Sequence, residues 1–393
     1  MLYSRTILPK INKYLKNKEI IVLTGMRRVG KTTLLRHVYD GIKSDNKILL
    51  DVENPLSRSY FEENDYNNIW NNLGSEGLDK SKKAYIFLDE IQAMPEITKA
   101  IKYLYDHYDV KFFVTGSSSY YLKNLFPESL AGRKFEFELF PLSFEEFLLF
   151  KGVEKAFYPS ILMTAKYKNI IVYEKTKNYY AEYLKWGGFP EVVLEKNKET
   201  KKMKLEDIFK AYFEKDVKGL ADFSNLSRFR DLMILLVQRV GSKLDISKLA
   251  SEVGVSRQTI YSYITFLQAT YFLSLVPPFS KSVDREVSGN NKVYICDTGL
   301  INLLGKVSAG SILENAVFLN LKRYGKVQFY DKRKGGEIDF ILNEAIALEV
   351  KNKAIEQDFK KIKKMSKTLG LKNCYLVSNE FVDKNYAIIA QDL

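Results

Sequence analysis

Cysteine and histidine are nearly absent from this chain of 393 residues, which contains only two of each. The two cysteines, Cys296 and Cys374, are too few for a disulfide framework or a cysteine zinc site. Two histidines nearly exclude a metal centre built from imidazole ligands. No apolar run approaches the roughly 18 residues that a membrane span needs, and residues 1–20 lack an apolar stretch of signal-peptide length. We therefore expect a cytoplasmic protein with no membrane partner.

Proline and glycine are also scarce, with 9 and 21 residues, which excludes collagen-like and proline-rich low-complexity chains. The hydrophobic fraction of 46% and the charged fraction of 28% are those of a globular protein. The formal net charge of +13 favours an anionic partner. That signal is weak, because lysine dominates the basic residues and the chain is rich in Ile, Asn, Tyr and Phe, a bias typical of genomes with low GC content.

Short apolar runs alternate with helical patterns in the first part of the chain. The runs cover residues 19–25, 47–53, 84–89 and 111–116, and each ends at a polar residue or a glycine. This alternation predicts an α/β fold in which helices cover both faces of a parallel sheet. Ligands of such sheets bind at the carboxyl ends of the strands.

A phosphate-binding motif follows the first of these runs. Residues 25–32, Gly-Met-Arg-Arg-Val-Gly-Lys-Thr, match G-x-x-x-x-G-K-[ST] at every fixed position. The glycines allow a tight turn whose N–H groups point at phosphate oxygens, and the following helix directs its positive end at them. Lys31 is expected to reach the β- and γ-phosphates and the Thr32 hydroxyl to bind Mg²⁺. The predicted nucleotide-binding residues are Gly25, Arg27, Arg28, Gly30, Lys31, Thr32 and Thr33.

Two acidic residues end the third apolar run, Tyr-Ile-Phe-Leu-Asp-Glu. Asp89 stands at the strand end, where it would hold Mg²⁺ directly or through water. Glu90 is placed to orient and deprotonate the water that attacks the γ-phosphate. Thr115, Ser117 and Ser118, at the end of the fourth run, are candidates for a polar residue that contacts the γ-phosphate; Ser117 is the one we assign.

Arginine is rare in this chain, and three arginines are candidates for charge stabilisation. A planar guanidinium fits a transferring phosphoryl group better than an ammonium does. Arg133, in Leu-Ala-Gly-Arg-Lys, is the residue we assign to this role. Arg27 and Arg28 within the phosphate loop are the alternatives, so the identity of the catalytic arginine stays open.

Five stretches together resemble one known family. They read GMRRVGKTTLL, YIFLDEIQ, VTGSSSYYL, LAGRKFEFELFPLSFEEF and YLKWGGFPEVV. The combination is similar to a prokaryotic AAA-type P-loop ATPase family whose members carry a C-terminal domain of unknown function. The resemblance extends from about Lys18 to Lys351 and implies ATP as the nucleotide. A guanine-recognition N-K-x-D signal does not follow VTGSSS.

Residues 245–267 have the pattern of two helices around a tight turn at Gly254, with a strand after them. This predicts a winged helix-turn-helix. Arg257, Gln258 and Thr259 fall at the exposed start of the second helix, where a recognition helix contacts base edges. Double-stranded DNA and other proteins remain equal candidates for the partner of this segment.

The last part of the chain places acidic residues on adjacent predicted strands. Asp339 lies in EIDFIL, while Glu349 and Lys351 share one face of AIALEVK. Glu314, in the preceding helical stretch, is a fourth candidate. This D…E-x-K arrangement resembles the core of the restriction-endonuclease superfamily and predicts a second Mg²⁺ site held by Asp339 and Glu349 with Lys351 and Glu314. Whether the domain cleaves nucleic acid stays open.

The expected organisation has four parts. Residues 1–150 form the P-loop AAA-type ATPase domain and 151–240 a helical lid or linker. Residues 241–285 form the winged helix and 286–393 an α/β restriction-endonuclease-like domain. One functional hypothesis is an ATPase that acts on DNA. The other is an ATP-dependent switch that binds partner proteins and carries an inactive nuclease-like domain. The oligomeric state does not follow from the sequence.

Overall fold

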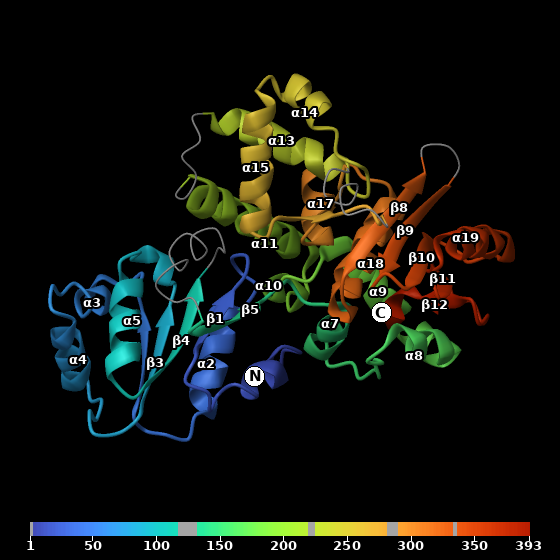
Figure 1. Cartoon of the computed structure of the whole chain (residues 1–393). Coiled ribbons are helices and arrows are strands. Elements are labelled where there is room, and N and C mark those ends of the chain that lie inside the picture. Colours follow the sequence, from blue (N-terminus) through green and yellow to red (C-terminus); the bar gives the residue numbers. More distant parts are fainter. Residues whose placement is uncertain (1–2, 117–131, 219–224, 281–289, 333–335) are drawn as a thin grey trace. The chain divides into compact units, whose positions relative to one another are not determined.

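The computed structural model describes residues 3–116, 132–218, 225–280, 290–332 and 336–393. The chain divides into two compact units, which are best followed separately in Figure 1. The first unit combines Met1–Phe140 with two later segments, Lys210–Asp222 and Ala269–Tyr271. The second unit contains the remaining residues. None of the described helices is both long and apolar enough to cross a membrane.

A parallel sheet of five strands forms the centre of the first unit, in the order β2-β3-β4-β1-β5. The strands are β1 (Ile20–Thr24), β2 (Lys47–Asp51), β3 (Ala84–Asp89), β4 (Val110–Gly116) and β5 (Lys134–Glu138). The predicted α/β class is confirmed, and the first four strands match the four apolar runs. The edge strand β5 was not predicted, because its sequence KFEFE alternates and its residues are half-buried or exposed.

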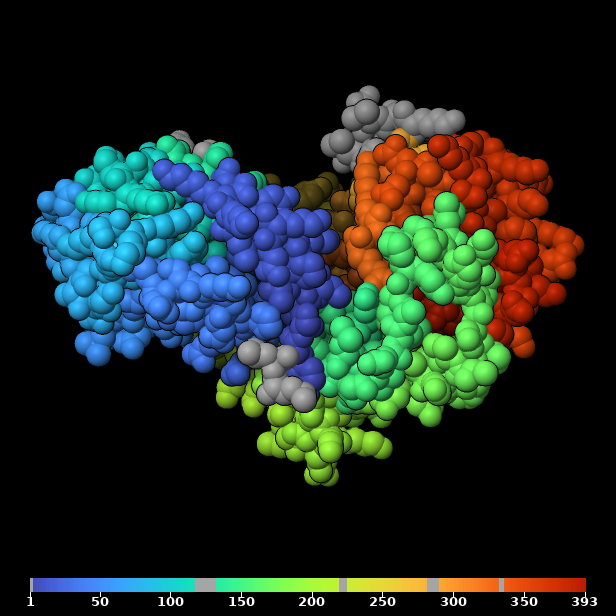
Figure 2. All heavy atoms as spheres, turned by 90° about the horizontal axis from the view of Figure 1, so that it is seen from below, coloured from blue at the N-terminus to red at the C-terminus, as the bar shows by residue number. Residues whose placement is uncertain are grey.

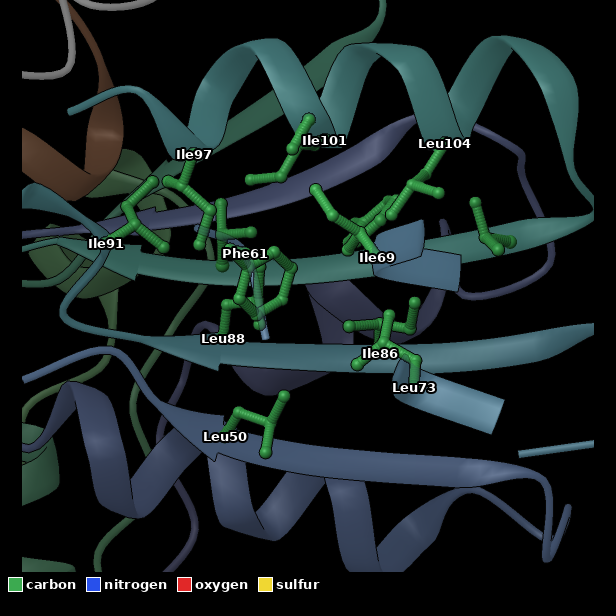
Figure 3. Packing of buried hydrophobic residues seen from close by; sticks show 14 of the residues in the cluster. Leu50, Phe61, Ile69, Leu73, Ile86, Leu88, Ile91, Ile97, Ile101 and Leu104 are labelled. Carbon is green, nitrogen blue, oxygen red and sulfur yellow. The ribbon is translucent and has the colours of Figure 1, made fainter. Parts of the chain in front are cut away.

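Helices pack on both faces of this sheet because both faces of its strands are apolar. On one face, Ile97, Ile101 and Leu104 of α5 (Ile97–His107) are fully buried at helical spacing beside Ile86 of β3, as Figure 3 shows. On the other face, the Phe87 ring of β3 stacks on Phe113 and meets Tyr39 of α2 (Lys31–Gly41) edge-on. The remaining helices of this unit include α1 (Leu8–Asn12), α2 (Lys31–Gly41), α3 (Pro55–Ser59) and α4 (Tyr66–Ser75).

The second unit begins with a run of helices, in agreement with the predicted helical region. These are α7 (Phe144–Phe150), α8 (Ile161–Lys166), α9 (Ile170–Trp186), α10 (Pro190–Val193), most of α11 (Lys198–Ala211) and α13 (Leu226–Gln238). Figure 2 shows the green segment around α8 beside the red C-terminal residues. An ion pair of 2.7 Å between Lys155 and Asp392 ties the two together. The end of the chain therefore packs on the helical region.

A five-stranded mixed sheet forms the C-terminal part of this unit, in the order β12-β11-β10-β9-β8. Its strands are β8 (Val327–Lys332), β9 (Gly336–Leu342), β10 (Ile346–Lys351), β11 (Asn373–Ser378) and β12 (Ala387–Ile389). Strands β8 to β10 are antiparallel neighbours, whereas β10, β11 and β12 are parallel. Helix α18 (Ala309–Leu321) precedes the sheet, and α19 (Glu356–Leu369) joins β10 to β11. The first predicted C-terminal strand, β7 (Lys292–Ile295), pairs instead with β6 (Leu273–Val276).

The stretch WGGFP has a structural explanation in the second unit. Asp297 caps α17 (Thr298–Leu304) and also accepts a hydrogen bond of 2.6 Å from the N–H of Gly188. A Cβ atom on Gly187 would lie 2.0 Å from Asp297 Oδ1, so only glycine fits there. Burial raises the pKa of Asp297 to about 6, although three backbone N–H groups partly offset this effect. The contacts of Asp297 therefore hold the end of α9 against the start of α17.

Candidate functional site

The phosphate loop joins the carboxyl end of β1 to the start of α2. Gly25 has φ +150°, and a Cβ atom there would lie 2.1 Å from the carbonyl oxygen of Leu139, so glycine is required. Gly30 is left-handed at φ +96° and caps α2, which starts at Lys31. The helix therefore begins directly at the loop, with its free N–H groups facing the same space.

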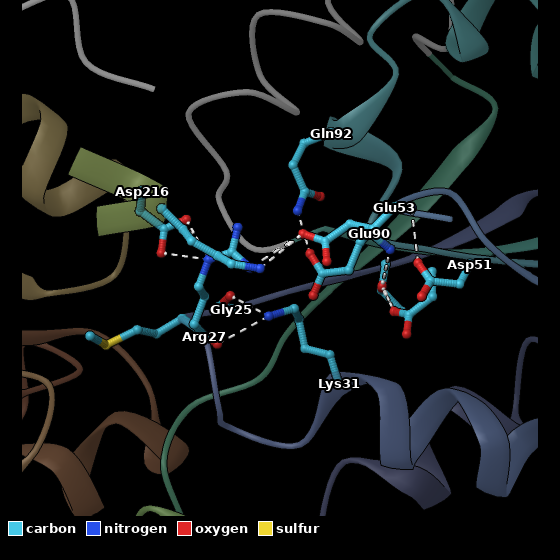
Figure 4. Close-up of polar contacts among 12 residues, drawn as sticks. Gly25, Arg27, Lys31, Asp51, Glu53, Glu90, Gln92 and Asp216 are labelled. Carbon is cyan, nitrogen blue, oxygen red and sulfur yellow. Dashed lines mark hydrogen bonds and ion pairs between the residues drawn. The ribbon is translucent and has the colours of Figure 1, made fainter. Parts of the chain in front are cut away.

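Lys31 folds back over the loop, as Figure 4 shows. Its ammonium donates hydrogen bonds of 3.0 and 3.1 Å to the carbonyl oxygens of Gly25 and Met26. Burial lowers the pKa of Lys31, and the charges of Glu90 and Asp216 partly compensate. No carboxylate of the described residues is hydrogen-bonded to this ammonium, and a buried cation of this kind is a favourable place for an anionic ligand.

Asp89 lies at the carboxyl end of β3 and is 5% exposed. It accepts hydrogen bonds from the hydroxyl groups of Thr32 and Thr115. Burial raises its pKa, and these two bonds act in the opposite direction. The structure thus brings together Thr32 and Asp89, the two residues predicted to hold Mg²⁺, and adds Thr115 from the end of β4.

Glu90 has a backbone conformation that residues other than glycine rarely adopt, with φ +53°. Its N–H donates a hydrogen bond of 3.1 Å to Thr115 Oγ1, and its carboxylate accepts one from the Gln92 side chain. Strained residues of this kind cluster at functional sites, where the surrounding structure holds them in place. Gln92 was not identified from the sequence, since nothing in its spacing marks it.

Arg27 lies between two carboxylates. Its Nε donates a hydrogen bond of 3.1 Å to Asp216 Oδ1, and its Nη1 lies 3.9 Å from Glu53 Oε1 (Figure 4). Asp216 belongs to a short π-helix, Tyr212–Val217, in a segment of the first unit. This partner could not be predicted from the sequence, because 189 positions separate it from Arg27.

The other predicted residues of this site lie as follows. Arg28, with φ +66°, and Thr33 are exposed. Ser117 and Ser118 fall outside the described residues. The structure does not bring Arg133, our candidate for charge stabilisation, to the phosphate loop of this chain. Arg133 precedes β5 beside Ile20, at the sheet edge opposite the loop, and binds Asp106 at 3.0 Å.

The predicted helix-turn-helix residues form α14 (Ile246–Val253) and α15 (Arg257–Ala269), separated by Gly254 in the left-handed conformation at φ +72°. Thr259 donates its N–H to Ser256 Oγ at 3.0 Å, which caps α15. Arg257 and Gln258 are exposed at the start of α15, and Thr259 is half-buried. The antiparallel pair β6–β7 follows.

The C-terminal carboxylates lie together at the junction of β9 and β10. The N–H of Val350 donates a hydrogen bond of 2.8 Å to Asp339 Oδ2, and Lys351 Nζ lies 2.9 Å from Glu349 Oε1. Burial raises the pKa of Glu349 to about 7, and the nearby charge of Asp339 adds to this. The structure thus brings Asp339 and Glu349 to the same side of the sheet.

A lysine that the sequence analysis did not identify lies among these acids. The Lys292 ammonium is 3.3 Å from Glu314 Oε1, 2.5 Å from Glu337 Oε1 and 3.9 Å from Asp339 Oδ1. Burial alone would lower the pKa of Lys292, but the carboxylates raise it above its ordinary value. In the described part of the chain, no group of three or more His, Cys, Asp and Glu side chains is arranged to hold a metal ion.

Family comparisons agree with the first unit's fold. Residues 17–148 match the family model of an AAA domain, which confirms the prediction of an AAA-type P-loop domain. Residues 177–311 and 309–390 match two domains of unknown function, DUF8612 and DUF4143. These two matches leave the predicted winged helix and restriction-endonuclease-like domain as predictions.

Relatives of known sequence extend over nearly the whole chain. The uncharacterized protein MJ1544 of Methanocaldococcus jannaschii is 31% identical over 398 residues, which cover 97% of this chain and 86% of that protein. The chain therefore belongs to the same protein family as MJ1544. An uncharacterized protein of Haemophilus influenzae is 28% identical and covers 86% of this chain and 85% of its own length.

Solved structures align only loosely. The Aeropyrum pernix ORC1 protein in complex with DNA has a TM-score of 0.32 and 12% identity, covering 77% of this chain and 92% of that one. Cdc6p of Pyrobaculum aerophilum has a TM-score of 0.33 and 11% identity, covering 80% and 96%. Similarity at this level assigns no function to the chain.

Proposed function

We propose that the chain binds Mg²⁺-ATP at the phosphate loop and hydrolyses it. The observation that carries the proposal is the hydrogen-bonded set of Thr32, Asp89, Thr115 and Glu90 beside the buried Lys31. The ends of two parallel strands, β3 and β4, and the start of α2 supply these side chains, at the sheet edge where ligands of such folds bind. A magnesium ion bound to Thr32 and Asp89 would neutralise charge on the phosphates.

Each residue has a distinct part in the proposed reaction. Lys31 exchanges its two bonds to loop carbonyls for bonds to phosphate oxygens. Glu90 accepts a proton from the attacking water, and Gln92 holds its carboxylate in place. Thr115 fixes both the Asp89 carboxylate and the Glu90 backbone. The strain at Glu90 is maintained by these neighbours.

The wider proposal keeps the four-part organisation for a cytoplasmic protein: ATPase at 1–150, lid at 151–240, winged helix at 241–285 and nuclease-like domain at 286–393. ATP turnover would drive a conformational change that is coupled to DNA. The exposed Arg257 and Gln258 at the start of α15 support duplex DNA as the partner. Association with DNA is one proposal for this segment, and contact with proteins is its alternative.

A second candidate is a nucleotide-dependent switch whose nuclease-like domain does not cleave. The Lys292 ammonium among Glu314, Glu337 and Asp339 supports it, because this cation already balances charge that a metal would otherwise neutralise. The metal-binding role of Asp339 and Glu349 with Lys351 and Glu314 remains the competing proposal.

One experiment separates these functions. ATP turnover is measured with and without duplex DNA, and nicking is scored on the same DNA in Mg²⁺ and Mn²⁺. Lys31→Ala is expected to lose tight Mg²⁺-ATP binding, and Glu90→Gln to bind ATP but lose turnover. Parent-like turnover by Glu90→Gln would show that the assigned base is incorrect. ATP turnover without nicking favours the switch with an inactive domain.

A further inference from the structure

The region that matches DUF8612 contributes a buried acid to the phosphate loop. Asp216 lies outside the AAA match at 17–148 and inside the match at 177–311. Asp216 is 1% exposed, and its carboxylate contacts the Arg27 side chain, which is 14% exposed. Both residues belong to the first compact unit.

The contact fixes one edge of the guanidinium. Arg27 Nε lies 3.1 Å from both carboxylate oxygens of Asp216, while Nη1 lies 3.9 Å from Glu53. Because Asp216 binds at Nε, the two terminal nitrogens remain directed away from it, which is visible in Figure 4. A guanidinium held in this way loses less freedom when it binds phosphoryl oxygens with its outer edge.

The segment that carries Asp216 is itself held firmly. It is a π-helix, Tyr212–Val217, and such turns occur frequently at functional sites. The Tyr212 hydroxyl lies 2.7 Å from Thr270 Oγ1, and both residues are buried. Lys215 Nζ lies 3.5 Å from Glu53 Oε1, so Glu53 contacts both the phosphate loop and this segment.

We propose that Asp216 is a positioning residue that orients Arg27 toward the γ-phosphate, so that this part of the DUF8612 region completes the ATP site. The inference rests on the proposed ATP hydrolysis. Arg27 stabilises the charge of the transferring phosphoryl group, and Asp216 affects kcat through Arg27, while its charge near Lys31 affects ATP binding. The AAA domain without the segment Tyr212–Val217 therefore has an incompletely ordered site.

The test compares steady-state ATP kinetics of full-length variants. Asp216→Asn keeps the side-chain volume but removes the charge that holds Arg27. We expect kcat to fall about tenfold while the KM for ATP stays equal or decreases, because a negative charge near an anionic ligand is lost. Asp216→Glu is expected to recover part of kcat. Glu214→Gln is the matched control, since Glu214 is exposed on the same segment and pairs with Lys218.

A double-mutant cycle tests whether Asp216 acts through Arg27. Arg27→Gln alone and Arg27→Gln with Asp216→Asn should have the same kcat. Additive losses, an unchanged kcat in Asp216→Asn, or a raised KM alone would overturn the inference and leave the proposed function intact. If Asp216→Asn unfolds, Asp216→Glu and Arg27→Gln decide, since a lower kcat in Asp216→Glu than in Arg27→Gln, or a wild-type kcat in Arg27→Gln, would exclude positioning. A wild-type chain that does not hydrolyse ATP overturns the proposed function itself, and the inference with it.

Discussion

The hydroxyl oxygen of Tyr271 lies 2.6 Å from Oγ1 of Thr24, although 247 positions separate the two residues. Thr24 ends β1 directly before the phosphate loop, and Tyr271 follows α15 by two residues. Both are buried, and Tyr271 is left-handed at φ +63°. The start of the loop is therefore bound to a residue that lies two positions after the end of α15.

Tyr271→Phe removes this bond and preserves the ring. We expect a loss of about 1–2 kcal/mol in the free energy of unfolding, since a buried hydroxyl loses its partner. We also expect slower ATP turnover, because Thr24 anchors the loop. Chemical denaturation and turnover assays measure both. Tyr261→Phe is the control, as the Tyr261 side chain is 55% exposed, and equal effects of the two changes would contradict the prediction.

Contiguous motifs could be read from the sequence, whereas contacts between distant segments could not. Gly25, Gly30 and Lys31 lie where the motif requires, because loop geometry depends on neighbouring residues. Asp216 and Tyr271 reach the loop only through tertiary packing, and neither belongs to a recognisable pattern. We chose Arg133 because arginine is rare in this chain. The rarity of a residue type does not indicate at which end of a strand the residue lies.

The double change Arg257→Ala and Gln258→Ala tests the DNA proposal. Both side chains are exposed at the start of α15, so duplex affinity should fall at least about tenfold while basal ATP turnover stays unchanged. Binding is measured at several salt concentrations, because phosphate contacts change the salt dependence. Lys360→Ala, on the exposed surface of α19, is the control. Unchanged affinity would favour a protein partner.

Gly187→Ala tests the packing of WGGFP against Asp297. The new Cβ would lie 2.0 Å from Asp297 Oδ1 at φ +75°, so we expect a loss of about 3 kcal/mol or more in unfolding free energy. Gly152→Ala is a matched control, because Gly152 has φ +71° but no atom within 4 Å of the added Cβ. The difference between the two variants isolates the steric clash. Equal denaturation midpoints would mean that Asp297 moves aside at little cost.

The pH dependence of stability tests the burial of Glu349. Its pKa in the folded chain is raised to about 7 from an ordinary 4.5, so the folded state favours the protonated form. Its contribution to stability is therefore present at low pH and is lost as the pH rises to about 7. Glu349→Gln cannot ionise, so its stability should not fall with pH in this way. From pH 5 to pH 8, its free energy of unfolding should rise by about 1–2 kcal/mol relative to that of wild type. Urea unfolding at both pH values measures this.

The control for that experiment is Glu356→Gln, since the Glu356 side chain is 68% exposed and pairs with Lys360 on the surface. Its stability should change with pH as in wild type. Parallel pH curves for Glu349→Gln and wild type would mean that Glu349 is better solvated than its position indicates. The Glu349 Oε2 atom is buried without a hydrogen-bond partner among the described residues. Ionisation at this position is therefore costly, and we expect the stabilities of Glu349→Gln and wild type to diverge as the pH rises.

The Lys292 ammonium balances the negative charge of the C-terminal acids. Its side chain is 3% exposed and lies beside Glu314, Glu337 and Asp339. Lys292→Met removes the ammonium and keeps most of the side-chain volume, so the acids repel one another. We expect a loss of about 3 kcal/mol in unfolding free energy, as is typical when one partner of a buried ion pair is removed. Lys326→Met, at an exposed pair with Glu344, is the control.

Divalent cations added to Lys292→Met distinguish the two proposals for this cluster. If Asp339 and Glu349 can hold a metal once the ammonium is gone, Mn²⁺ should raise the melting temperature of the variant more than that of wild type. Because a ligand stabilises only the state that binds it, the rise should increase with Mn²⁺ concentration. A variant that is destabilised but insensitive to Mn²⁺ would mean that the cluster is a closed ion-pair network. In that case the carboxylates serve the packing of β7 against β9, and the domain contributes structure rather than phosphodiester chemistry.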